Sequence, residues 1–168
     1  AEASGVGEAV EHLAVGGQGR HPGARGALVQ VEPGLVALAH VDEQPGPGER
    51  YWTDGWSGYP AARARLLAAL EASRARNPIC LSGDIHAFLA AKLNRVAADP
   101  DSPVAAAEFV TTSVSSQGLP AKMIADRLRE NPSLLAGTSE HRGYLRFDLH
   151  RERAQIDMVA MDTVFEPE

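Results

Sequence analysis

The stretch Asn77-Pro78-Ile79-Cys80-Leu81-Ser82-Gly83-Asp84-Ile85-His86 decides how this chain can fold. Its apolar first half is typical of a short buried strand, and Gly83 ends that strand. Asp84 and His86 follow at once. Because residues two apart in an extended backbone point to the same side, this spacing predicts that their side chains converge beyond a strand's carboxyl end. Open α/β sheets bind ligands at that edge, and a carboxylate with an imidazole suits a metal ion. The alternative is a turn in which Asp84 caps a following helix.

Strand-like and helix-like patterns alternate on both sides of this stretch. We expect strands at 27–31, 35–41 and 104–114, and helices at 61–76, 87–96 and 121–130. The helix at 87–96 would aim its positive amino end at the corner that holds Asp84 and His86. From Tyr144 onward, apolar and polar residues alternate, which predicts an antiparallel hairpin with one solvated face. The interleaving predicts an α/β or α+β fold with a mixed sheet and flanking helices.

The composition limits the function classes that the chain can serve. With 168 residues, of which 44% are hydrophobic, the chain is long enough for one globular domain. The net charge of −6 argues against a nucleic-acid-binding surface, although a bound metal ion can still attract phosphate groups. A single cysteine excludes an intrachain disulfide, and no apolar run approaches the roughly 20 residues that span a bilayer.

Other reactive side chains have plain structural explanations. Ser113, Ser115 and Ser116 follow a predicted strand, but no nucleophile elbow surrounds them, so local backbone hydrogen bonds are expected. Cys80 lies between apolar neighbours and is expected to be buried and inert. Glu108 could support a metal ligand or form a cross-strand ion pair, and the sequence leaves both open.

An aromatic segment precedes the helix predicted at 61–76. It holds both tryptophans, Trp52 and Trp56, together with Tyr59, and Pro60 fits the first helical turn. One interpretation is a packed loop that holds the helix down. The other is the wall of a pocket in which Tyr59 or Arg63 contacts an anion, and the sequence does not choose between them.

Four motifs in a fixed order resemble one known family. They are Asp54-Gly55-Trp56-Ser57-Gly58-Tyr59-Pro60-Ala61-Ala62-Arg63, Asn77-Pro78 leading to Ser82-Gly83-Asp84-Ile85-His86, the run Glu108 to Ser116, and Arg142-Gly143-Tyr144. Together they resemble the carboxyl-terminal half of the alkaline phosphatase D family, a branch of the calcineurin-like metallophosphoesterases. The resemblance covers roughly residues 37–164, so we divide the chain into a poorly matching segment, 1–34, and a phosphatase-like part, 35–168.

The resemblance implies a two-sheet sandwich flanked by helices, with metal ions at the carboxyl edge of the strands. It implies hydrolysis of phosphate monoesters and diesters, with calcium and iron as the expected ions. Asp84 and His86 match the family's late metal-ligand motif, so they are the predicted metal ligands and catalytic residues. Tyr59 and Arg63 are the predicted substrate-binding residues.

The resemblance is incomplete at the amino-terminal side. The family's first-half metal motifs do not precede Trp52, so we expect an incomplete site and weak or absent activity in the isolated chain. The alternative is a non-catalytic remnant or interaction module of the same fold. A partial sandwich would also leave an apolar face and a sheet edge uncovered, which predicts self-association. Members of the family are often exported, no export signal is recognisable here, and the compartment stays open.

Overall fold

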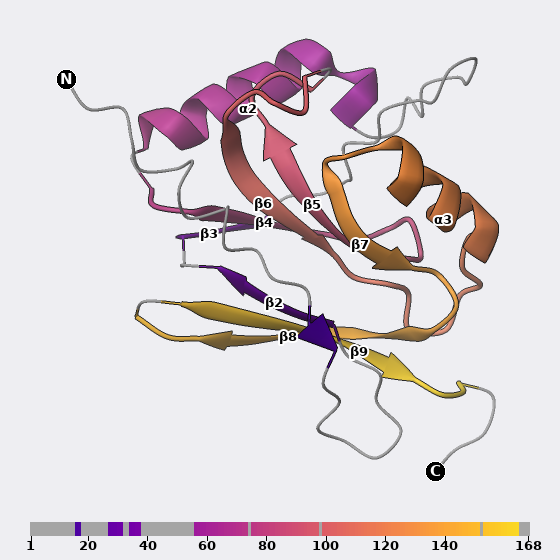
Figure 1. Cartoon of the computed structure of the whole chain (residues 1–168). Coiled ribbons are helices and arrows are strands. Elements are labelled where there is room, and N and C mark those ends of the chain that lie inside the picture. The colour runs from indigo at the N-terminus through magenta and orange to yellow at the C-terminus, as the bar shows by residue number, and fades with distance from the viewer. Residues whose placement is uncertain are drawn as a thin grey trace.

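Two β-sheets lie face to face in the computed structural model, and two helices cover the outer side of one of them (Figure 1). The structure describes residues 16–17, 27–31, 34–37, 56–73, 75–97, 99–151 and 153–164. The predicted aromatic segment before Trp56 and the residues 38–41 of the expected second strand lie outside these ranges.

The five-stranded sheet carries the stretch that opened the sequence analysis. Its order is β3 (Gly34–Ala37), β4 (Pro78–Ser82), β6 (Val104–Val110), β5 (Phe88–Asn94) and β7 (Leu134–Thr138). The first three strands are mutually parallel, whereas β5 runs antiparallel to both β6 and β7. The carboxyl ends of β4 and β6 therefore lie side by side at one edge of the sheet.

The four-stranded sheet is antiparallel throughout. Its order is β1 (Gly16–Gly17), β2 (Ala27–Val31), β9 (Ala154–Met161) and β8 (Arg142–Leu149). The pair β8–β9 confirms the predicted terminal hairpin, with Leu149 opposite Ala154 at its turn. Strand β2 pairs with β9, so part of the segment 1–34 contributes to this sheet, and the division at residue 35 stays a prediction.

The main core fills the space between the two sheets. Ile79, Phe88 and Phe109 of the five-stranded sheet meet Ile156 and Met158 of β9, and all are buried. Alternation along β9 places these residues on the inner face, as the sequence pattern predicted. In the described part of the chain the two apolar sheet faces thus cover each other, while β7 and β8 are edge strands. Self-association stays a prediction.

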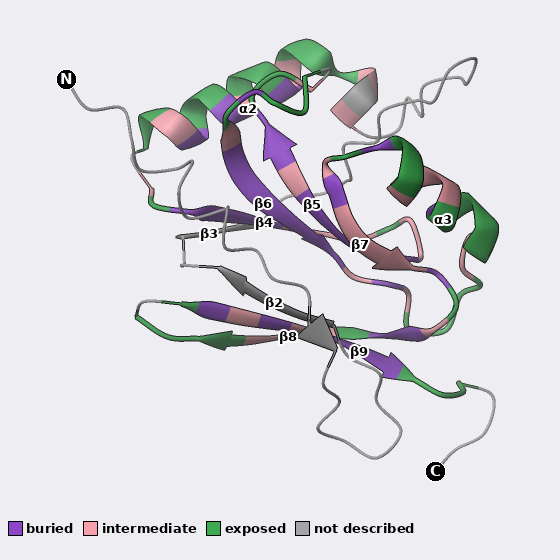
Figure 2. Cartoon of the chain, viewed as in Figure 1, coloured by how far each residue is buried: buried purple, intermediate pink, exposed green. Residues whose placement is uncertain are grey.

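Two helices complete the outer layer of the five-stranded sheet. Helix α2 (Pro60–Ala72) starts with proline at its first turn and packs Leu67 and Leu70 onto Cys80 and Leu93. Helix α3 (Ala121–Glu130) has the predicted bounds and packs around buried Ile124. Figure 2 shows the consequence: the central strands are buried, and exposed residues gather on the outward sides of both helices.

The helix predicted at 87–96 is wrong, because this segment is strand β5. Phe88 and Ala90 enter the core between the sheets, whereas Leu89 and Ala91 pack under α3. A strand buried on both faces has a continuous apolar sequence, and such a run cannot be told from a buried helix by its periodicity. The chain therefore enters a strand after His86, and the predicted helix amino end is not supplied by this segment.

Candidate functional site

The candidate site lies where β4 and β6 end together. The Thr111 amide donates to the Ser82 carbonyl at 2.9 Å, which continues the strand pairing one step beyond β6. Two loops therefore leave the sheet at the same place. One is 83–87, which carries Asp84 and His86, and the other is 111–118, which follows β6. We call this place the β4–β6 corner.

The backbone of the first loop is strained at the two predicted ligands. Asp84 has φ 76° and His86 has φ 57°, both in the left-handed region that residues other than glycine rarely adopt. The loop is therefore not extended, so alternation along a strand does not fix where the Asp84 and His86 side chains point, and their convergence stays a prediction. Such strain costs about 1–3 kcal/mol for each residue and concentrates at functional sites. The strained backbone, which the sequence did not reveal, thus supports a functional role for Asp84 and His86.

A hydrogen bond determines the chemical state of the His86 ring. Its Nδ1 lies 2.8 Å from the Gln117 carbonyl oxygen in the neighbouring loop. A carbonyl only accepts, so Nδ1 carries the hydrogen and, in the neutral ring, Nε2 keeps its lone pair. Histidines that bind metals usually hold their second nitrogen in this way, because the bond fixes both tautomer and ring orientation. In this tautomer the Nε2 atom of a neutral His86 ring carries no hydrogen.

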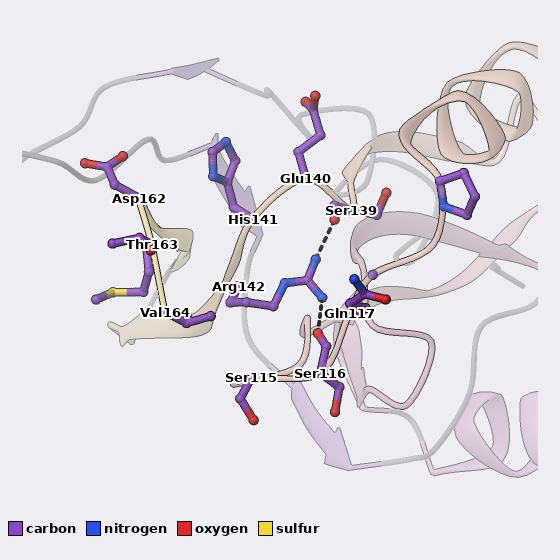
Figure 3. Close-up of a pocket in the computed structure, with 13 residues that line it drawn as sticks. Ser115, Ser116, Gln117, Ser139, Glu140, His141, Arg142, Asp162, Thr163 and Val164 are labelled. Atoms are coloured by element: carbon purple, nitrogen blue, oxygen red, sulfur yellow. Dashed lines mark hydrogen bonds between the residues drawn. The ribbon is translucent and has the colours of Figure 1, made fainter. Parts of the chain in front are cut away.

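Arg142, at the start of β8, ties the loops of the corner together. Its side chain is buried. The two hydrogens of Nη1 are shared among the Ser116 carbonyl at 2.7 Å, the Ser113 hydroxyl at 2.8 Å and, more weakly, the His86 carbonyl at 3.3 Å. Nη2 donates to the Ser139 carbonyl. Figure 3 shows the guanidinium group between Ser139 and Ser116. One side chain from the second sheet therefore connects three separate segments.

A hollow of about 430 Å³ opens beside this arginine (Figure 3). Hydroxyl, amide and ionisable groups predominate among the side chains that line it. They are Ser115, Ser116, Gln117, Ser139, Glu140, His141, Arg142, Asp162 and Thr163, with Gly118, Pro120, Met161 and Val164. The hollow adjoins the loop that bonds to the His86 ring, so a polar molecule at the corner would have space next to it.

A buried carboxylate lies on the helix side of the sheet, just before the corner. Glu108 is 2% exposed and accepts a hydrogen bond from the Ser82 hydroxyl at 2.7 Å. It is paired in register with Cys80. Cys80 is buried, as predicted, and burial, and secondly the charge of Glu108, raise the pKa of its thiol to about 12. A thiol that stays protonated is a poor nucleophile, in line with the expected inert role. Glu108 anchors the strand end that leads into Asp84.

The structure does not bring Arg63 to the corner. Its side chain is buried, and Nη2 donates to the Asn94 carbonyl at 3.0 Å. Asn94 pairs with Val104 at the amino end of β6, roughly 20 Å along the strand from Val110 at its carboxyl end. Tyr59 precedes α2 and is 59% exposed. Their substrate-binding roles stay predictions, and the contact of Arg63 favours a structural role.

Two further polar side chains have plain structural surroundings. The Ser113 hydroxyl donates to the Ser116 carbonyl at 2.7 Å, a local turn bond of the expected kind. His150 is exposed beside Asp148 on the hairpin. Within the described ranges, no three His, Cys, Asp or Glu side chains gather as a complete metal site. In the same ranges, no helix has the length and apolar character that crossing a bilayer requires.

No role for Arg142 or Gln117 followed from the sequence. Arg142 is 56 residues from His86 and belongs to the other sheet, so no local spacing connects the two. Gln117 acts through its backbone carbonyl, which any residue type supplies. The sequence signal at this position was that Arg142-Gly143-Tyr144 is one of the four motifs of the family resemblance.

Together these features define an α/β sandwich of two sheets whose candidate ligands lie in loops beyond the carboxyl ends of parallel strands. The chain belongs to the PhoD-like phosphatase family, because the sequence model of that family matches residues 30–158.

Two relatives agree with this assignment. The chain is similar to alkaline phosphatase D of Bacillus subtilis (strain 168), with 35% identity over 120 residues that cover 70% of this chain and 20% of that protein. It is also similar to the solved structure of PhoD, with a TM-score of 0.69 and 30% identity. That match covers 80% of this chain and 27% of the other. The chain thus spans about a fifth of the curated relative and about a quarter of the solved one.

Proposed function

We propose that this chain is the late part of a metal-dependent phosphoric ester hydrolase, acting on phosphate monoesters or diesters, with calcium and iron as its ions. The observation that carries the proposal is the His86 ring, bonded through Nδ1 to the Gln117 carbonyl at a strained loop beyond two parallel strands. Membership of the PhoD-like family supports the reaction class.

The residues at the corner fit part of such a metal site. Asp84 would supply a hard oxygen ligand and His86 a nitrogen ligand, a mixture that iron accepts, while calcium prefers oxygen. When bound, the ions would act as Lewis acids that stabilise negative charge on the phosphoryl oxygens. The other ligands would come from outside the described residues, since those residues offer no third His, Cys, Asp or Glu side chain there.

The chain's own contribution to the reaction is positional. The bond from Nδ1 to the Gln117 carbonyl keeps Nε2 free of hydrogen and limits rotation of the ring. The hydrogen bond from the Ser82 hydroxyl to Glu108 fixes the end of the strand that leads to Asp84. A site held in this way loses little ordering entropy when a ligand binds, which is the condition for effective catalysis by orientation.

The test is replacement of His86 in the longest naturally occurring protein that contains this chain. With iron and calcium supplied, we expect His86→Ala to lower turnover of p-nitrophenyl phosphate and of bis(p-nitrophenyl) phosphate by at least about 100-fold, because even partners outside the ligand shell contribute about 10–100-fold. His150→Ala is the matched control, since that imidazole is exposed on the hairpin. Unchanged turnover in His86→Ala would reject the proposal.

A second candidate is a non-catalytic remnant or interaction module of the same fold. It is favoured by the incomplete ligand set among the described residues. Its mark would be stable folding without metal and no phosphatase activity after iron and calcium are added. Metal-dependent turnover by the purified chain, abolished in His86→Ala, would reject it.

A further inference from the structure

We propose that Arg142 is a positioning residue that holds the His86 ring in its Nδ1–H tautomer and so keeps Nε2 available as a ligand atom. The link from this tautomer to metal binding rests on the proposed function. The tautomer itself does not, and it can be measured in the absence of metal.

The guanidinium group contacts the backbone beside both partners of the bond that sets the tautomer. On the donor side, Nη1 binds the carbonyl of His86 itself at 3.3 Å. On the acceptor side, it binds the Ser116 carbonyl at 2.7 Å, and this carbonyl belongs to the peptide that leads into Gln117. One rigid group therefore links the backbone of His86 to the peptide before Gln117, which limits how far the ring and the Gln117 carbonyl can move apart.

The surroundings of Arg142 hold its side chain in place. The side chain is buried, and its strand β8 is paired with β9 along its whole length, so its base is fixed by the second sheet. A planar guanidinium with several donors can bind carbonyls in different directions at once, which a lysine ammonium on a flexible stem does less well. Hydrogen bonds from a charged donor are stronger than those between neutral groups, so they can help to offset the backbone strain at His86.

The Arg142 guanidinium group and the carbonyls that it binds, which we call the clamp, are closely packed. A Cβ at Gly118 would overlap both Nη2 of Arg142 and the Ser139 carbonyl oxygen, and would lie 3.0 Å from the His86 carbonyl oxygen. The loop after β6 can therefore approach Arg142 only because position 118 has no side chain. Close packing on this side leaves the carbonyl of Gln117 little freedom to turn away from the ring.

The experiment measures the tautomer of His86 directly. Long-range ¹H–¹⁵N correlation spectra of the metal-free chain, at a pH where the ring is neutral, distinguish a protonated Nδ1 from a protonated Nε2. We expect the Nδ1–H form in the wild type. In Arg142→Gln the two ring ¹⁵N shifts should move toward each other, which indicates a mixture of tautomers. Arg146→Gln, on the same strand but exposed and paired with Asp157, is the matched control and should leave the shifts unchanged.

A milder variant covers the case in which Arg142→Gln does not fold. Ser113→Ala removes the hydroxyl that accepts from Arg142 and donates to the Ser116 carbonyl, and it should shift the same two resonances by a smaller amount. An Nε2–H wild type would overturn the proposal. So would unchanged shifts in folded Arg142→Gln or, if that variant is unfolded, in Ser113→Ala.

Titration with Zn²⁺ alone, in the longest naturally occurring protein that contains this chain, separates the two proposals. If both hold, Arg142→Gln should weaken binding by about 10–100-fold, the usual effect of losing a group that orients a ligand, and Arg146→Gln should not. If Zn²⁺ does not bind the wild type while the tautomer still depends on Arg142, the positioning role stands and the metal function of this chain fails.

Discussion

Replacing Gly118 by alanine tests whether the β4–β6 corner is as closely packed as the structure shows. The added Cβ would overlap the Ser139 carbonyl oxygen and Nη2 of Arg142, and the first of these is backbone that cannot move aside cheaply. Inserting a carbon into a filled space costs typically about 1–3 kcal/mol. Among the described glycines only Gly143 has positive φ, so the loss at Gly118 would be steric and not conformational.

Gly83→Ala provides the control on the other side of the same corner. A Cβ there would meet only the Thr111 methyl at 3.5 Å, an ordinary contact. Since alanine reduces the entropy of the unfolded chain, this change should be neutral or stabilise by about 0.4–1 kcal/mol. The two alanine variants should therefore differ by about 1–4 kcal/mol in the free energy of unfolding.

Urea unfolding followed by circular dichroism measures this difference, provided that both variants keep the wild-type slope against denaturant. Gly118→Ala should also move the two ring ¹⁵N shifts of His86, because the clamp and the His86 carbonyl lie next to the new methyl group. A Gly118→Ala variant as stable as Gly83→Ala, with an unchanged His86 spectrum, would show that the corner is loose and would refute the reasoning.

Two further predictions concern the core and its one thiol. Phe109→Ala, at a residue that is 0% exposed between the sheets, should lower the free energy of unfolding by about 3–5 kcal/mol, whereas Leu149→Ala, 50% exposed, should change it by less than about 0.5 kcal/mol in the same urea experiment. Cys80 has its pKa raised from 9.0 to about 12 in the folded chain, so its contribution to stability is complete below pH 9 and is lost as the pH rises toward 12. Cys80→Ala should remove that part of the loss of stability at alkaline pH. In the folded chain, Cys80 should resist a thiol reagent at pH 8 that modifies it in urea. Equal modification rates in the folded and the unfolded chain would contradict the burial of Cys80.

The sequence by itself determined much of the local structure and singled out the candidate site. The alternation in 144–160 specified a hairpin, because a strand with one wet face carries its period visibly, and 121–130 carried the helical period of α3. Asp84 and His86 stood out because a short apolar run ended immediately before them. The four ordered motifs indicated the family that the comparisons then showed.

Only the tertiary structure decided the rest. Strand β5 was misread as a helix because burial on both faces erases the period of 2, and that burial comes from the second sheet and α3. Arg63 could not be placed from sequence, since its partner is a backbone carbonyl at the other end of β6. The state of the His86 ring depends on the Gln117 carbonyl and on Arg142, which lie 31 and 56 residues away. Every residue type has a backbone carbonyl, so the sequence does not reveal which carbonyls will accept these bonds. The bonds form only when the two sheets pack against each other.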